Sequence, residues 1–166
     1  MQIEIENLKN HPEYVDTVVK WLFSEWGNDN FQFWYSWVKS SLSSYDIPKT
    51  YIAFLDKRLV GTYSLWRCDL QSCQDLFPWF GGLYVDSNYR GKEYNGCKLG
   101  VYMQKHAIKE LRALGYKQVY LFTEKSPKYY IDNGWKLIGT VPDETDMMVS
   151  LCKYWIDEVK NERKQN

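Results

Sequence analysis

Residues 78–100 read PWFGGLYVDSNYRGKEYNGCKLG, and this stretch decides how the rest of the chain is interpreted. Its first part, Trp79–Val85, is an apolar run between a proline and an aspartate, which predicts a buried strand. A basic turn follows, and the pattern predicts a helix that begins at Gly96 or Cys97 and reaches Leu114. The first amides of a helix lack partners and its dipole favours negative charge there, so this strand-turn-helix predicts an anion site.

Two familiar phosphate-binding motifs do not occur here. Walker A requires GxxxxGK[ST], whereas residues 91–98 read GKEYNGCK, in which Cys97 separates the glycine from the lysine. No GxGxxG occurs in the chain. Arg90 and Lys92 add positive charge to the turn. The spacing alone leaves two interpretations open, an anion site and an ordinary connection between a strand and a helix.

The flanking sequence predicts a single α+β domain over residues 1–156. Apolar periodicity places helices at residues 14–26, 31–42, 96–114 and 126–133, and strands at residues 3–5, 50–55, 59–67, 79–85, 118–123, 135–141 and 147–154. This order mixes hairpins with crossover helices, which predicts a mixed, mostly antiparallel sheet of about seven strands flanked by helices. The charged C-terminal tail, residues 157–166, is expected to be a frayed helical end.

Composition and charge exclude several classes of function. The chain has 166 residues with 21 Lys and Arg against 21 Asp and Glu, so generic attraction to nucleic acid or to an anionic membrane is not expected. The N-terminus has no signal-peptide pattern and the longest apolar run is far shorter than a membrane span, so we expect a cytoplasmic chain. Four cysteines without a CxxC pair, and only two histidines, predict no metal site and no disulfide framework. His11 and His106 are expected to be structural or solvent-facing.

The run from residue 78 to 100 resembles the acyl-coenzyme-A-binding segment of the GCN5-related N-acetyltransferase (GNAT) family, whose loop motif is [QR]xxGx[GA]. Residues 123–139, TEKSPKYYIDNGWKLIG, are similar to a later strand-helix-strand of that family, in which an aromatic pair precedes Gly-Trp or Gly-Phe. The hairpin of residues 48–65, PKTYIAFLDKRLVGTYSL, also fits. The resemblance implies a GNAT-like three-layer sandwich and acetyl-CoA as co-substrate.

The loop departs from the family motif at two positions. With Arg90 aligned to the first position, Glu93 stands where the first glycine is expected and Asn95 where the second Gly or Ala is expected. Glycine lets the backbone approach the pyrophosphate and take positive φ, and of the two replacements only Asn tolerates that conformation cheaply. Glu93 is therefore expected to face solvent or to weaken binding, unless Gly96 takes over one glycine's role after a local shift.

The resemblance also implies roles for particular residues. Backbone groups at Leu83, Tyr84 and Val85 would pair with the pantetheine, with plain core as the alternative for these positions. The remaining expected cofactor contacts are Arg90, Gly91, Lys92, Glu93, Tyr94, Asn95, Gly96, Cys97 and Thr123. Tyr130, four residues before Gly134, has the position of the family's tyrosine that protonates the departing thiolate, and Tyr129 and Tyr120 are nearby competitors.

We therefore expect an acetyl-CoA-dependent N-acetyltransferase in which an amine attacks the thioester directly. The buried strand contains no carboxylate or histidine, so Asp69, Asp75, Glu124 or water remain as candidates for the general base. The alternative is a catalytically degenerate acyl-CoA-binding or regulatory module.

The acceptor is expected to be a small-molecule or peptide amine, and the protein a monomer or homodimer. Aromatic residues of the first two predicted helices would line an acceptor pocket for an aromatic or cationic molecule, or belong to the core. They are Trp26, Phe31, Phe33, Trp34, Tyr35 and Trp37.

Overall fold

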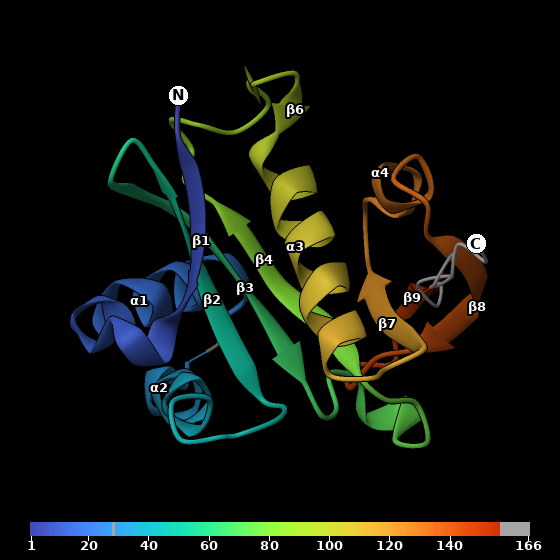
Figure 1. The fold of residues 1–166 in the computed structure, drawn as a ribbon. Helices are drawn as coiled ribbons and strands as arrows, with labels where there is room; N and C mark the ends of the chain where they lie inside the picture. The colour runs from blue at the N-terminus through green and yellow to red at the C-terminus, as the bar shows by residue number, and fades with distance from the viewer. Residues whose placement is uncertain (28, 157–166) are drawn as a thin grey trace, which may run out of the picture.

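Within residues 1–27 and 29–156, which the computed structural model describes, seven strands form one mixed sheet in the order β1-β2-β3-β4-β7-β9-β8 (Figure 1). These strands are β1 (Ile3–Asn7), β2 (Lys49–Leu55), β3 (Arg58–Trp66), β4 (Trp79–Val85), β7 (Gln118–Thr123), β8 (Lys136–Pro142) and β9 (Met148–Trp155). The helices are α1 (Val15–Trp26), α2 (Phe31–Ser40), α3 (Leu99–Ala113) and α4 (Pro127–Ile131), with short 3-10 helices at Leu8–Asn10, Pro12–Tyr14 and Gln71–Cys73. The helical end expected at residues 157–166 lies outside the described residues.

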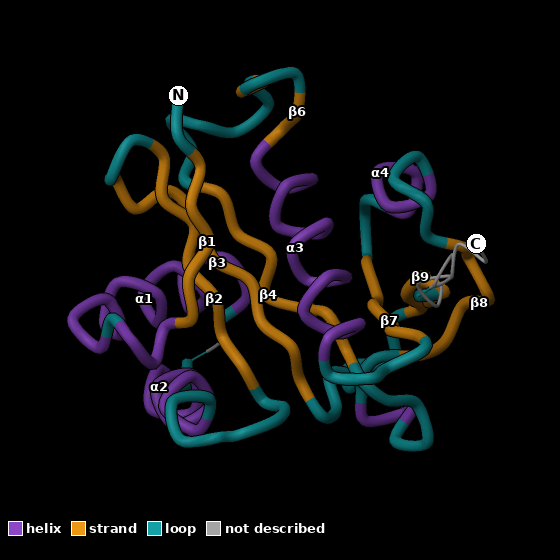
Figure 2. Tube along the Cα trace, viewed as in Figure 1, coloured by secondary structure: helices purple, strands orange, loops and turns teal. Residues whose placement is uncertain are grey.

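Helices cover both faces of the sheet (Figure 2). On one face, Leu22 of α1 and Ile52 of β2 share a buried cluster. On the other face, Met103 of α3 and Phe80 of β4 belong to the largest buried cluster. The pairing is antiparallel throughout except between β4 and β7. The expected α+β fold, a mostly antiparallel sheet of seven strands between helices, is confirmed.

Strands β4 and β7 separate soon after they start. Their ladder contains one pair, Trp79 with Tyr120, next to which Tyr120 N donates to Pro78 O at 3.0 Å. Beyond this pair β4 continues along β3 until Val85 lies opposite Gly61, while β7 pairs with β9 on its other side. The edge of β4 that faces β7 is therefore open over most of its length.

A β-bulge bends β4 beside this opening. The register of the β3–β4 ladder shifts between Thr62 and Ser64, and Gly82 there has a φ of 58°. Any other residue would be strained at this φ, and a Cβ on Gly82 would lie 3.2 Å from Leu22 Cδ2 of α1. A bulge leaves strand backbone groups outside the ladder, so it adds to the polar groups at the opening.

The expected start of the helix at Gly96 or Cys97 is wrong. Two short strands, β5 (Glu93–Tyr94) and β6 (Cys97–Lys98), form a hairpin there, and α3 begins at Leu99. The turn residues Asn95 and Gly96 have φ values of 51° and 77°. Positive φ at both central residues is typical of the two-residue hairpin turn that an Asn-Gly pair favours. The Asn95-Gly96 dipeptide is the sequence signal that predicts this turn.

No helix of the described residues combines the length and apolar character that crossing a membrane requires. In the same part of the chain, no cluster of three or more His, Cys, Asp or Glu side chains is placed to hold a metal ion. His11 contacts Glu6 at 2.6 Å, and His106 Nδ1 lies 2.8 Å from Tyr63 Oη in the interior under α3. Both histidines therefore take part in structural contacts.

Candidate active site

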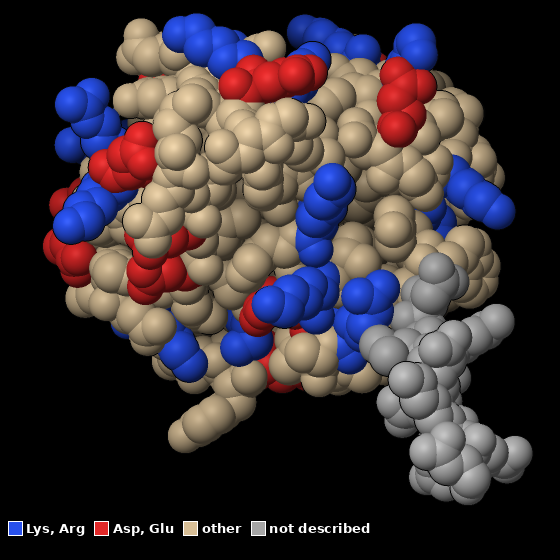
Figure 3. All heavy atoms as spheres, turned by 45° about the horizontal axis from the view of Figure 1, so that its top comes forward, with Lys and Arg blue, Asp and Glu red and all other residues tan. Residues whose placement is uncertain are grey.

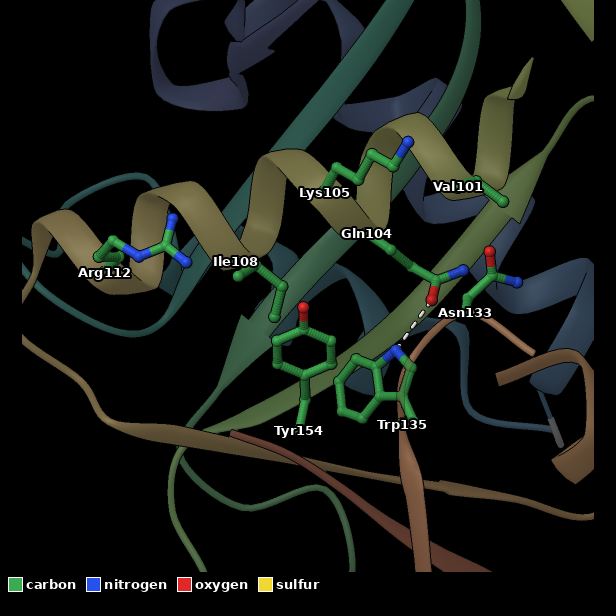
Figure 4. A pocket seen from close by; sticks show the side chains of 8 residues that line it. All are labelled: Val101, Gln104, Lys105, Ile108, Arg112, Asn133, Trp135 and Tyr154. Carbon is green, nitrogen blue, oxygen red and sulfur yellow. Dashed lines mark hydrogen bonds between the residues drawn. The ribbon is translucent and has the colours of Figure 1, made fainter. Parts of the chain in front are cut away.

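A groove runs along α3, between this helix and the segment that carries α4 and β8. It consists of two cavities of about 310 and 260 Å³ that share Val101 and Asn133. The first is lined by Glu93, Gly96, Cys97, Lys98, Val101, Tyr129, Asp132 and Asn133. The second, shown in Figure 4, is lined by Val101, Gln104, Lys105, Ile108, Arg112, Asn133, Trp135 and Tyr154. The groove therefore reaches from the β5–β6 hairpin along the side of α3.

Gln104 joins the two walls of the groove. Its side chain is only 3% exposed, although the amide carries both donors and an acceptor. Trp135 Nε1 donates to Gln104 Oε1 at 2.9 Å (Figure 4). Gln104 Nε2 in turn donates to Tyr129 Oη at 3.1 Å. The sequence analysis missed Gln104, because one glutamine beside the apolar stripe of a helix has no distinctive spacing.

Gly100 provides the close approach of α3 to α4. A Cβ on Gly100 would lie 2.6 Å from Tyr129 Oη and 3.8 Å from Leu83 Cδ2 of β4. The absence of a side chain therefore leaves room for the Tyr129 hydroxyl. It also brings the first turn of α3 close to the strand whose edge is open.

The start of α3 presents backbone amides without a side-chain cap. The N-cap position is Lys98, whose side chain makes no capping hydrogen bond. The first amides of a helix have no partners within it, and the positive end of the dipole adds to their attraction for anions. Because Gly96, Cys97 and Lys98 also line the adjoining cavity, this end of the groove suits a phosphate group.

The two basic residues of the loop are held elsewhere. Arg90 Nε donates to Val85 O at 2.6 Å, and Arg90 Nη2 donates to Glu25 Oε2 of α1 at 3.0 Å. Its guanidinium also lies 4.9 Å from the centre of the Tyr84 ring. Lys92 Nζ donates to Asn88 O at 2.8 Å. In this structure both side chains stabilise the loop, and neither is among the residues that line the groove.

Glu93 lies on the β5–β6 hairpin, where it is exposed. It pairs in register with Lys98, also exposed, so that opposite charges face each other across the hairpin. Tyr94 is buried and packs in the core with Leu99, which anchors the hairpin to α3. Gly91, with a φ of 73°, turns the chain before the hairpin. Glu93 is therefore exposed, as expected, and it also lines the cavity next to the start of α3.

Tyr130 is partly buried against the large core cluster and is not among the residues that line the groove. Its ring packs edge-on against Tyr129 and Trp135, with centroids 5.1 and 6.1 Å away. Burial raises the pKa of Tyr130 well above the usual tyrosine value, and the charges of Tyr129, Cys152 and Asp69 add to the effect. Tyr130 is therefore protonated at neutral pH, as a proton donor must be.

The remaining residues that the sequence analysis named for the site make structural contacts. The Tyr129 hydroxyl is bonded to Gln104, and Tyr120 packs against Trp79 on the opposite face of the sheet. Thr123 Oγ1 accepts from Ser126 N at 3.1 Å and so connects the end of β7 to α4. Leu83 and Val85 are partly buried against the large core cluster, which agrees with the core alternative for their side chains. The Val85 carbonyl accepts from Arg90 Nε.

The aromatic residues of the first two helices also divide. Trp34 and Tyr35 pack against the core under α1 and α2. Trp37 lies 4.8 Å from the Trp66 ring of β3, at the side of the sheet opposite to α3. Trp26, Phe31 and Phe33 are 45%, 39% and 52% exposed, so they remain available to an acceptor.

Figure 3 shows the end of the molecule that carries the β5–β6 hairpin turned forward. Lys and Arg side chains alternate with Asp and Glu side chains along the top and left of this face, and several Lys and Arg side chains lie close together below its centre. At the start of α3 itself, a phosphate group would accept from backbone amides.

An open sheet edge, a bulged strand and an uncapped helix lie at one end of this fold, and unpaired backbone groups of this kind suit an extended anionic ligand. The chain matches the model of the Acetyltransferase (GNAT) family over residues 12–130 and belongs to this family. The protein is accordingly an acetyltransferase with acetyl-CoA as its co-substrate. No curated protein sequence matches the chain.

Several solved structures share the fold. An aminoglycoside 6'-N-acetyltransferase complexed with coenzyme A is 16% identical, with a TM-score of 0.73 over 95% of this chain and 98% of that one. An aminoglycoside 6'-acetyltransferase type Ii is 17% identical, with a TM-score of 0.71 over 95% and 99%. An acetyltransferase from Streptococcus agalactiae is 19% identical, with a TM-score of 0.66 over 92% and 98%. At these identities the likeness shows the fold alone.

Proposed function

We propose that the protein transfers the acetyl group of acetyl-CoA to an amine of a small-molecule or peptide acceptor by direct attack on the thioester. The observation that carries this proposal is an open β4 edge close to the uncapped start of α3, with the partly buried Tyr130 packed against the adjoining core. The aminoglycoside acetyltransferases of the same fold support an amine as the acceptor.

Residues of this chain fit acetyl-CoA along the groove. Backbone groups at Leu83, Tyr84 and Val85 would pair with the pantetheine as an added strand does. The amides from Gly96 into the first turn of α3 would bind the pyrophosphate. Arg90 and Lys92 would reach the pyrophosphate only by exchanging their contacts to Glu25 and Asn88, so we assign them to holding the loop.

The chemistry needs a polarised carbonyl and a proton for the leaving sulfur. Acetyl-CoA supplies the activated thioester. A backbone amide at the Gly82 bulge would donate to the oxygen on which negative charge develops. Tyr130, which is protonated at neutral pH, would donate its proton to the departing sulfur.

A thiol-release assay with a panel of amines tests the proposal. Tyr130→Phe keeps the ring and removes the proton, so kcat should fall by roughly 10² or more while the affinity for CoA stays constant. Tyr129→Phe is the matched control. It should keep its turnover and lose about 1 kcal/mol of stability, because the Tyr129 hydroxyl bonds to Gln104. Full turnover by Tyr130→Phe, with chemistry rate-limiting, would contradict the role of Tyr130.

The second candidate is an acyl-CoA-binding module without catalysis. The hairpin at Asn95 and Gly96 favours it, because this hairpin stands where the family motif has its glycine-rich turn. CoA binding without thiol release for every amine tested would favour this candidate over the enzyme.

A further inference from the structure

The carboxylate of Asp69 lies against the middle of β4. Asp69 belongs to the loop between β3 and β4, and a Cβ on Gly81 would collide with Asp69 Oδ2. The same Cβ would lie 3.0 Å from Trp66 Cδ1, so Gly81 leaves a space that the carboxylate and the indole share. Gly81 comes two residues after Trp79, whose pair with Tyr120 is the last contact of the β4–β7 ladder. Asp69 therefore lies where the two strands part.

Asp69 and Tyr130 approach this opening from opposite sides of the sheet. Trp66, next to Asp69, belongs to the cluster that α2 covers through Trp37. Tyr130 packs with the core on the side of α3. The charge of Asp69 nevertheless contributes to the raised pKa of Tyr130, so the two groups are within electrostatic reach of each other through the opening.

The surroundings of Asp69 suit a proton acceptor at neutral pH. Burial, followed by the charge of Glu144 on the β8–β9 loop, raises the pKa of Asp69 to about 7. A base whose pKa lies near the working pH combines a large ionised fraction with a strong affinity for a proton. The other candidates named from the sequence, Asp75 and Glu124, are exposed.

We infer that Asp69 is the general base that takes a proton from the acceptor amine, and this inference rests on the proposed function. The acceptor ammonium group gives one proton to Asp69, and its nitrogen then forms the bond to the carbonyl carbon. The C–S bond breaks, the sulfur takes a proton from Tyr130, and the second proton of the nitrogen passes through solvent to the Tyr130 oxygen. Asp69 releases its proton to solvent, so the ammonium group and the thioester yield an amide, a thiol and one proton. The acceptor enters from the side of α2, where Asp69 Oδ2 and Trp66 Cδ1 both border the space left by Gly81.

The test is the dependence of kcat/KM on pH, measured by thiol release for one amine that the wild type acetylates. The wild type should lose activity as the pH falls through about 7. Asp69→Asn should lower kcat/KM at pH 7.5 by roughly 10²-fold or more. The pH below which activity falls, the acid limb of the profile, should also move up toward the pKa of the amine itself, about 10. Asp75→Asn, on the same loop and exposed, is the control and should match the wild type.

A second variant keeps the test decisive if Asp69→Asn folds poorly. Glu144→Gln removes the charge that helps to raise the pKa of Asp69, so its acid limb should move to lower pH with the plateau retained. An unchanged limb in Glu144→Gln, or a wild-type profile in Asp69→Asn, overturns the inference. The proposed function fails separately, if the wild type binds CoA in calorimetry but releases thiol with no amine.

Discussion

Replacing Asp69 with Asn should stabilise the protein at alkaline pH, because a buried carboxylate with a raised pKa opposes folding when it is ionised. The pKa of Asp69 rises from an ordinary value of 3.8 to about 7. Each pKa unit corresponds to about 1.36 kcal/mol, so the ionised side chain costs about 4 kcal/mol of folding free energy above pH 8. Asn has nearly the same shape and carries no charge, so it avoids this cost.

The sign and the pH window follow from the direction of the shift. Because the folded-state pKa lies above the unfolded value, the contribution of Asp69 to stability is fully present below about pH 4. This contribution to stability is lost as the pH rises through about 7, and above that pH it no longer changes. The advantage of Asp69→Asn should therefore grow by about 2.5 kcal/mol between pH 5 and pH 8.

Urea denaturation of both proteins at pH 5, 6, 7 and 8 measures this difference, and titration of all other groups cancels in the comparison. For a domain of this size, each 1 kcal/mol should also appear as roughly 2 to 4 °C in Tm. A constant difference across the four pH values would show that the carboxylate is hydrated in the native state. Asp69 would then lack the raised pKa that suits a base at neutral pH.

Two further substitutions test the groove. Gly100→Ala should destabilise the protein by about 1 kcal/mol in thermal unfolding, because its Cβ would displace Tyr129 Oη, 2.6 Å away, and this loss outweighs the gain in helix propensity. Gly139→Ala, whose Cβ would meet no atom within 4 Å, is the control and should be nearly neutral. Glu93→Gly should change the calorimetric affinity for acetyl-CoA by less than about 1 kcal/mol, because Glu93 is exposed. A tenfold gain in affinity would instead show that the carboxylate opposes the phosphates.

Local sequence patterns predicted the order of helices and strands well. Apolar periodicity and β-rich runs report which faces of each segment are buried, and this information is local. The exception was the loop before α3, where Asn95 and Gly96 form a hairpin turn. The positive φ values of these two residues form the hairpin turn, whereas the sequence analysis placed the start of the helix at Gly96 or Cys97. Tyr130 was predicted as the proton donor from the family resemblance, because no periodicity distinguishes one tyrosine among 14.

The groups that complete the site depend on long-range packing that no local pattern reports. Asp69 is one of the three loop carboxylates that the sequence offers as candidate bases, and only the folded loop brings it to Gly81. Gln104 contacts Trp135, 31 residues away in the chain. Each of these contacts is defined by the approach of two distant elements.

The separation of β4 and β7 explains why the proposed acid and base come from opposite faces of one sheet. In a continuous ladder the backbone groups of β4 would be paired, and the sheet would divide Tyr130 from Asp69 completely. The single pair at Trp79 ends the ladder early, which frees the β4 edge. On the α3 side of the sheet lies the groove, with amides for an anionic co-substrate. On the α2 side, Asp69 and Trp66 border the space left by Gly81, and a carboxylate beside an indole suits an amine. A thioester that lies along the β4 edge would then receive the nitrogen from the side of α2 and the proton for its sulfur from the side of α4. The two proton transfers can therefore be disabled one at a time, by Asp69→Asn and by Tyr130→Phe.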